Sequence, residues 1–298
     1  MKTKNEMTEK VANILKANDL DFRIEKQRLV SEKGLETPYF GLFNSKTGNC
    51  INTVKEGYTV SQNDEILELV LRGIEGFGEL SVSKAGSINE GRKVFIQLGI
   101  DGFTKVGSES IKRYVTIIDS NDGSTGLSVG IGELVMSCQN QFFKFYKSGQ
   151  SKMKHTASLI QRIKEIPMLI ENTLSESLLL TETYKSFQST QVSRNLANEL
   201  VNSILGFDKT MSLAKETELS TRSLNAMESL YNHIEKEMNQ KGDNLFGLFS
   251  GVTSWTTHEK SAPRRENGRI ESIITGNNYK TNQQALQFSL NKLGLVLA

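Results

Sequence analysis

The spacing of apolar residues along the chain changes near Thr156. Before this point apolar and polar residues alternate over short runs, which is typical of strands buried on one face. After it apolar residues recur every three or four positions, as on the buried face of a helix. The sequence predicts an α+β fold, with a mainly β region over residues 1–155, a mainly helical region over residues 156–298, and both regions in one continuous domain unit.

The mainly β region is predicted to hold two groups of antiparallel strands. The first group covers residues 22–30, 39–43 and 57–61, and a helix from about residue 62 to 74 follows it. The second group covers residues 79–84, 93–100, 114–118 and 127–131. Turns such as Asn121-Asp122-Gly123 join these strands. The predicted sheet is therefore an antiparallel meander with an inserted helix, packed against a helical C-terminal half.

Three apolar stripes predict the main helices, over residues 163–178, 192–204 and 224–238. Pro167 predicts a kink or the true start of the first helix, because proline lacks the amide donor of a helix interior. Gly206 and Gly242 predict the ends of the other two. A short helix is expected near residues 7–18 and a closing one over residues 281–293, with loops at 266–269 and 275–280.

Composition narrows the class of protein only a little. A chain of 298 residues is long enough for one large domain or two, and its net charge of +2 is too small to indicate nucleic acid by itself. No apolar run approaches the length of a membrane span, and the start MKTKNEMTEK has no apolar core like that of a secretion signal. We therefore expect a cytoplasmic protein, in the host cell if a phage encodes it, with Cys50 and Cys138 reduced and structural.

The strongest local excess of positive charge lies between Gln141 and Lys164, and we call this stretch the basic segment. In it cations alternate with aromatic rings and no acidic residue occurs. Single-stranded nucleic acid suits such a segment, because phosphates bind the cations and bases stack on the rings. Strand alternation places Tyr146 on the same face as Lys144, so Tyr146 is the predicted stacking residue. The alternative is a final sheet strand with buried rings, followed by a helix with a solvated basic face.

The predicted nucleic-acid-binding residues combine this segment with cations of the neighbouring strands. They are Arg92, Lys93, Lys112, Arg113, Lys144, Tyr146, Lys147, Lys152, Lys154, His155 and Arg162.

The sequence contains no motif for a cofactor or for nucleophilic catalysis. It lacks a glycine-rich phosphate loop, and its three histidines have no metal-ligand spacing. Cys138 has no neighbouring histidine that would activate its thiol. One enzymatic alternative stays open: Asp119, Asp122 and His155 would suit a metal-dependent nuclease if the strands bring them together. We predict no catalytic residues and no cofactor.

Several short motifs carry a resemblance to a known family. They are Gly57-Tyr58-Thr59-Val60-Ser61-Gln62-Asn63, Asn121-Asp122-Gly123-Ser124, Cys138-Gln139-Asn140, Lys154-His155-Thr156, the stretch from Phe246-Gly247-Leu248 to Thr253 with His258, and Ala285-Leu286. Through them the chain resembles a phage- and plasmid-borne family catalogued as domain of unknown function 932. That family usually has a histidine where this chain has Asn121, which argues against a catalytic or metal centre at the turn. The resemblance implies a protein of a mobile element.

The order of strands, helix, strand meander and long helix is also similar to the core of phage single-strand annealing proteins. This likeness concerns element order and not motifs. It implies a basic groove, homo-oligomeric rings or filaments, and strand annealing in recombination without nucleotide hydrolysis. Single-stranded DNA is thus the expected partner, and a structural or interaction protein of a phage or plasmid without a DNA role is the alternative.

Overall fold

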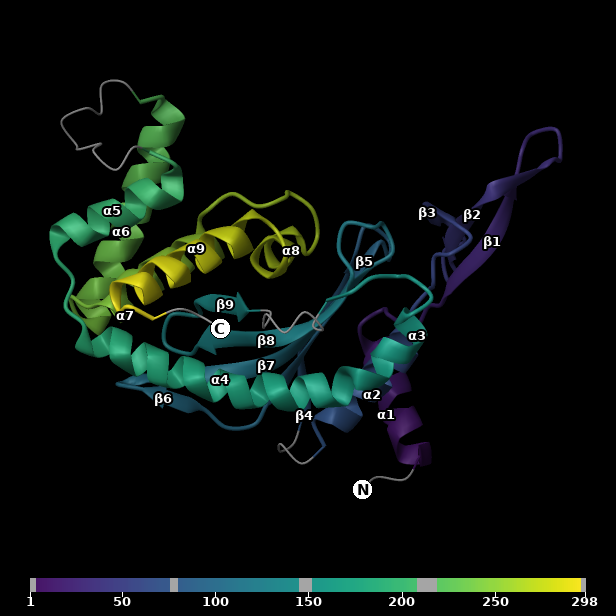
Figure 1. Cartoon of the computed structure of the whole chain (residues 1–298), viewed down its shortest axis with the longest axis horizontal. Helices are drawn as coiled ribbons and strands as arrows, with labels where there is room; N and C mark the ends of the chain where they lie inside the picture. Colours follow the sequence, from purple (N-terminus) through teal and green to yellow (C-terminus); the bar gives the residue numbers. More distant parts are fainter. Residues whose placement is uncertain (1–3, 76–79, 145–151, 208–218, 296–298) are drawn as a thin grey trace. The chain divides into compact units, whose positions relative to one another are not determined.

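The computed structural model describes residues 4–75, 80–144, 152–207 and 219–295. The chain forms two compact units. The first unit contains Met1–Gly102, Arg113–Gly132 and Phe145–Glu176, and the second contains Phe103–Lys112, Glu133–Lys144 and Ser177–Ala298. The predicted α+β class is confirmed, with antiparallel sheets in the N-terminal half and mostly helices in the C-terminal half (Figure 1).

A three-stranded antiparallel sheet lies in the first unit. Its strands are β1 (Ile24–Val30), β2 (Glu36–Asn44) and β3 (Cys50–Lys55), in the order β1-β2-β3. The strand predicted over residues 57–61 is wrong, because this segment is a loop and the third strand precedes it. The loop's polar groups bind elsewhere: Lys26 donates to the Tyr58 carbonyl, and the Thr59 amide donates to the His155 carbonyl.

The larger sheet is the predicted meander. Its main strands have the order β10-β8-β7-β5-β4, with β6 paired to β7 and β9 paired to β8. The bounds are β4 (Leu80–Ile88), β5 (Lys93–Ile100), β6 (Thr104–Val106), β7 (Glu109–Ser120), β8 (Leu127–Val135), β9 (Gln141–Lys144) and β10 (Lys152–Met153). Both β7 and β8 contribute residues to each unit.

Helices α1 (Lys4–Ala17) and α2 (Asn63–Gly73) pack against each other in the first unit. The apolar face predicted for the second of them is buried, with Ile66, Leu67 and Val70 in the core. The chain then forms α3 (Leu159–Arg162), a 3-10 turn (Ile163–Glu165) and α4 (Ile166–Ser189), which continues into the second unit. Pro167 lies in the first turn of α4, where its missing amide donor costs nothing, so it marks a helix start as predicted.

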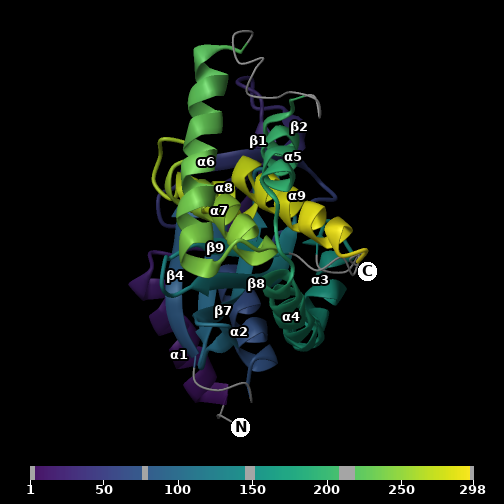
Figure 2. The same cartoon turned by 90° about the vertical axis from the view of Figure 1, so that its left-hand side faces the viewer.

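The second unit contains α5 (Arg194–Leu205), α6 (Thr221–Lys241), α7 (Leu245–His258), α8 (Gly268–Ile274) and α9 (Asn277–Lys292). Gly206 and Gly242 follow the last residues of α5 and α6, as predicted. The prediction missed α7 and α8, and it placed a loop where α9 begins. Helix α7 packs against both α6 and α9 (Figure 2).

Close contact between helices explains why the sequence pattern did not predict α7. All its residues from Leu245 to Thr257 are buried, so it shows no amphipathic stripe. Two glycines lower its intrinsic helix propensity. They are required because a Cβ at Gly251 would overlap the backbone of Ile234, and one at Gly247 would lie 2.5 Å from the Gly242 carbonyl oxygen.

None of the helices that the structure describes is long and apolar enough to cross a membrane.

Candidate nucleic-acid interface

The part of the basic segment that begins with β10 lies at an edge of the larger sheet in the first unit. Lys152 and Lys154 are exposed on either side of Met153, which is fully buried. Lys152 pairs with Ser128 of β8, and a Cβ at Gly126 would overlap the Met153 carbonyl. The Arg162 guanidinium donates to the Lys152 carbonyl at 3.4 Å. This close backbone packing holds three cationic side chains together at one edge.

The rings of β9, which precede the predicted stacking residue Tyr146 in the sequence, have a different environment. Phe142, Phe143 and Lys144 are 5%, 1% and 8% exposed, so both faces of β9 are covered. Helices α7, α8 and α9 contact this strand, and the Phe142 ring packs edge-on against Phe249 at 5.3 Å. The expected exposed face for Lys144 is therefore wrong, because a strand covered on both faces shows no outer face. Tyr146 and Lys147 lie outside the described residues.

His155 is the centre of a buried polar cluster in the first unit. Its Nε2 lies 2.8 Å from Asp119 Oδ1, and its Nδ1 lies 2.9 Å from the Thr59 carbonyl oxygen. Ser61 donates to the other carboxylate oxygen of Asp119 at 2.5 Å. The Tyr58 ring stacks on the imidazole, with centroids 4.8 Å apart. Three segments distant in the sequence thus meet at one imidazole.

These contacts favour the charged form of His155. Both ring nitrogens face oxygen atoms, one of the Asp119 carboxylate and one of the Thr59 carbonyl, and a protonated imidazolium can donate to both. Burial lowers the pKa of His155, but the hydrogen bond and negative charge of Asp119 outweigh burial and hold this pKa above its ordinary value. Burial, with the charges of Asp119 and Asp122, raises the pKa of the Tyr58 hydroxyl. The cluster therefore contains a buried ion pair, which lies next to the loop that carries Lys154.

Arg92 and Lys93 lie at the same end of β7 as His155. Lys93 pairs with Ser120, and the Asn121 amide donates to the Arg92 carbonyl at 2.7 Å. Burial acts to raise the pKa of Asp122, yet hydrogen bonds from Ser124 and the charge of Lys93 leave it below the ordinary value. The charge of Lys93 is thus partly compensated, whereas Arg92 is exposed.

The remaining predicted cations are less accessible to a nucleic acid. Arg113 is 8% exposed, and Lys112 is half-buried in the second unit. The structure therefore brings together six of the predicted residues in the first unit: Arg92, Lys93, Lys152, Lys154, His155 and Arg162. His155 is buried and contributes through its contacts with neighbouring segments.

The nuclease interpretation required a shared metal site. Asp119 and His155 do meet, but each imidazole nitrogen already contacts a protein oxygen, Nε2 that of Asp119 and Nδ1 that of the Thr59 carbonyl. Among the described residues no group of three or more His, Cys, Asp or Glu side chains is arranged to hold a metal ion. The residues present do not fit a divalent ion.

A second group of motifs meets in the second unit. His258 Nε2 lies 3.1 Å from the Cys138 carbonyl oxygen and 3.2 Å from Asn140 Oδ1. Asn140 donates to the Ser250 carbonyl at 3.3 Å, and the Gln141 amide donates to Thr257 at 3.0 Å. The motifs that carry the family resemblance thus form two clusters, one in each unit.

Sequence reasoning missed a buried ionic cluster in the second unit. The Lys241 ammonium lies 2.5 Å from Glu237 and 3.6 Å from Glu109, and the Lys241 and Glu237 side chains are each 1% exposed. Burial lowers the pKa of Lys241, but hydrogen bonding to Glu237 outweighs burial and raises this pKa. The four-residue spacing of the pair on one helix was the available signal.

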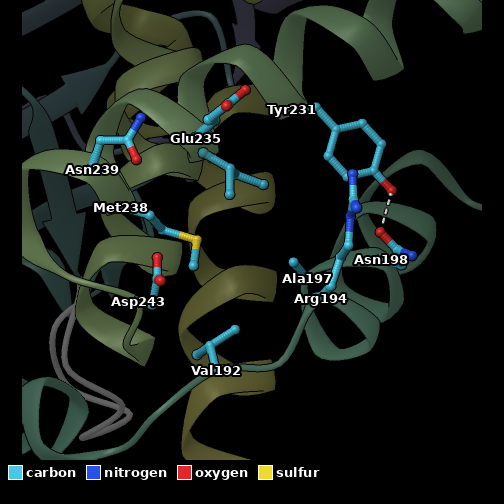
Figure 3. A pocket seen from close by; sticks show the side chains of 10 residues that line it. Val192, Arg194, Ala197, Asn198, Tyr231, Glu235, Met238, Asn239 and Asp243 are labelled. Atoms are coloured by element: carbon cyan, nitrogen blue, oxygen red, sulfur yellow. Dashed lines mark hydrogen bonds between the residues drawn. The ribbon is translucent and has the colours of Figure 1, made fainter.

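A pocket of about 530 Å³ opens between α5 and α6 in the second unit (Figure 3). Glu235, Met238 and Asp243 line one side and Arg194 the other, where the Tyr231 hydroxyl donates to Asn198 at 2.8 Å. The volume is typical of small-ligand pockets. Two carboxylates against one guanidinium make it unfavourable for a phosphate, so it is not part of the basic surface.

The fold and site define an α+β protein with a basic sheet edge braced by a buried His–Asp pair. The family model Domain of unknown function (DUF932) matches residues 50–286, and the chain belongs to this family. No curated protein and no solved structure matches the chain.

Proposed function

We propose that the protein binds single-stranded DNA through the edge of β10, as a self-associating protein of a mobile element that pairs DNA strands without nucleotide hydrolysis. The observation that carries the proposal is the grouping of Lys152, Lys154 and Arg162, with no acidic residue between Gln141 and Lys164. The exposed Lys152 and Lys154, with the half-buried Arg162 beside them, are able to contact a phosphate backbone. A cytoplasmic location belongs to the proposal and is supported by the free thiols Cys50 and Cys138.

The proposal predicts a specific salt dependence. If Lys152, Lys154 and Arg162 each neutralise one phosphate, log affinity falls with log salt at a slope of roughly −2 for a single strand. Replacing Lys152 and Lys154 by Ala should make this slope shallower by about 1.4. Fluorescence anisotropy with labelled single-stranded and duplex oligonucleotides at several salt concentrations measures both quantities.

The matched control removes the same charge elsewhere. Lys4→Ala with Lys236→Ala changes two exposed lysines outside the basic edge and should leave the slope unchanged. Wild-type protein without salt-dependent binding to single strands contradicts the proposal. So does a Lys152, Lys154 double variant that binds with the wild-type slope.

A protein-interaction role is the second candidate. Leu178 and Leu179 of α4 are 62% and 69% exposed. Two adjacent solvent-exposed leucine side chains favour a contact with another protein surface. In this proposal the surface joins copies of the chain, which is compatible with strand pairing by an oligomer.

A further inference from the structure

The pocket between α5 and α6 lies wholly in the second unit, and its lining contains none of the predicted nucleic-acid-binding residues. Its volume of about 530 Å³ is sufficient for a small organic molecule. Part of the lining is apolar: Ala197 and Ile234 are buried core residues, and the half-buried Val192 and Met238 pack against the same core. The pocket can therefore receive an aliphatic group on this side.

Hydrogen bonds between its walls hold the pocket in shape. The Val192 amide donates to the Asp243 carbonyl at 3.0 Å, and the residues next to these two form an antiparallel bridge. Further along α6, the Tyr231 hydroxyl donates to Asn198 of α5 at 2.8 Å (Figure 3). A site whose walls are already connected needs little ordering when a ligand binds. The pocket is therefore preformed.

Three charged side chains line the pocket, with opposite signs on opposite sides. Arg194 lies on one side, and Glu235 and Asp243 lie on the other (Figure 3). Within the described part of the chain, none of these three side chains forms an ion pair or a hydrogen bond with another residue. Their charges are therefore available to a ligand.

The helix ends beside the pocket increase this separation of charge. Arg194 is the first residue of α5, and Asp243 follows Gly242, the residue that ends α6. The N-terminus of a helix carries partial positive charge and its C-terminus partial negative charge. Each of these side chains thus has the same sign as the helix end next to it. This is unfavourable for the helix by itself, but it strengthens the binding of a ligand group of opposite charge.

We infer that this pocket binds a free basic amino acid. Arg194 binds the carboxylate of the ligand, and Glu235 and Asp243 bind its two cationic groups. The aliphatic stem of the ligand packs against Val192 and Met238. Two negative groups and one positive group in the pocket are thus matched by two positive groups and one negative group in the ligand.

The second acid of the pocket favours the free molecule over the last residue of a peptide, in which the α-amino group is an uncharged amide. The inference goes beyond the proposed function, because it concerns neither DNA nor the basic edge.

Isothermal titration calorimetry of the full chain with L-lysine tests the inference, and L-lysine should bind saturably. Three analogues each lack one of its charges: L-norleucine the side-chain ammonium, cadaverine the carboxylate, and Nα-acetyl-L-lysine the α-ammonium. Each analogue should bind about tenfold more weakly or worse, because it leaves one charge of the pocket without its partner.

A substitution in the pocket separates the role of the guanidinium. Arg194→Ala should weaken binding of L-lysine about tenfold or more, whereas cadaverine, which has no carboxylate, should bind at least as tightly as to the wild type. Arg222→Ala is the matched control at another exposed arginine of the second unit and should leave both affinities unchanged. Because Arg194 is exposed, the melting temperature of Arg194→Ala should stay at the wild-type value.

Three outcomes overturn the inference. The first is wild-type protein that shows no saturable binding of L-lysine. The second is binding of L-norleucine or Nα-acetyl-L-lysine as tight as that of L-lysine, because the two carboxylates then select no cation. The third is an equal effect of Arg194→Ala and Arg222→Ala on L-lysine binding, which would place the bound amino acid outside this pocket.

Discussion

His155 joins three segments of the first unit through one imidazole ring. The ring connects the loop after β3, the end of β7 and the residues after β10. The sequence placed His155 among the nucleic-acid-binding residues of the basic segment, directly after Lys154. It did not predict burial, because the partner Asp119 is 36 positions away and pairing across that separation depends on strand register.

The charge pair predicts an unusual histidine titration. The chain has three histidines, so proton NMR can follow each ring. One resonance should titrate above the ordinary pKa of 6.5 and should vanish in His155→Phe. In Asp119→Asn the remaining burial dominates, so the pKa of His155 should fall below 6.5. A His155 pKa that is the same in both proteins contradicts the ion pair.

The same pair makes stability depend on pH. Because the folded-state pKa of His155 is raised, its contribution is fully present below pH 6.5 and is lost as pH rises through the raised pKa. His155→Phe should lower the free energy of unfolding by about 3 kcal/mol at pH 6, since it leaves a buried carboxylate without its cation. Urea denaturation should show this loss shrinking at higher pH. In an Asp119→Asn background the trend should reverse, because a lowered pKa of His155 makes the folded state lose stability as pH falls.

At the scale of elements, periodicity predicted the helices with one buried face and the strands of the meander. It missed α7, and for β9 it predicted a strand, with buried rings as the stated alternative, but not the burial of Lys144. A fully buried element shows no contrast between faces, so its sequence carries no amphipathic signal. The same limit explains Lys144, whose place in an alternating run indicated an exposed face that the strand lacks.

The contact between α6 and α7 depends on Gly251. Gly251→Ala should lower the free energy of unfolding by about 2 kcal/mol, because the added methyl group overlaps the Ile234 backbone and forces the helices apart. Urea denaturation measures the change. Gly57→Ala is the control: a Cβ there meets no atom within 4 Å, so stability should stay within about 0.5 kcal/mol of wild type. Equal stabilities of the two variants would show that α6 and α7 tolerate separation.

At the scale of the whole molecule, self-association is the property that the proposed strand pairing requires. Sedimentation should give a mass above the monomer value of 33.3 kDa at micromolar concentration. Replacing Leu178 and Leu179 by Glu should return the protein to a monomer, because charged side chains cannot be buried in an apolar contact. Leu35→Glu, at a residue that is 67% exposed, should leave the mass unchanged. A wild-type monomer with and without DNA contradicts the proposal.

The interleaving of the two units has a consequence for synthesis on the ribosome. Segments Phe103–Lys112 and Glu133–Lys144 belong to the second unit but emerge before the first unit ends at Glu176. Phe142 and Phe143 are therefore synthesised well before Phe249 and Tyr279, the rings that they contact in the folded protein. A nascent chain therefore carries two unshielded phenylalanines for about a hundred further residues of translation, an interval in which chaperone binding competes with aggregation.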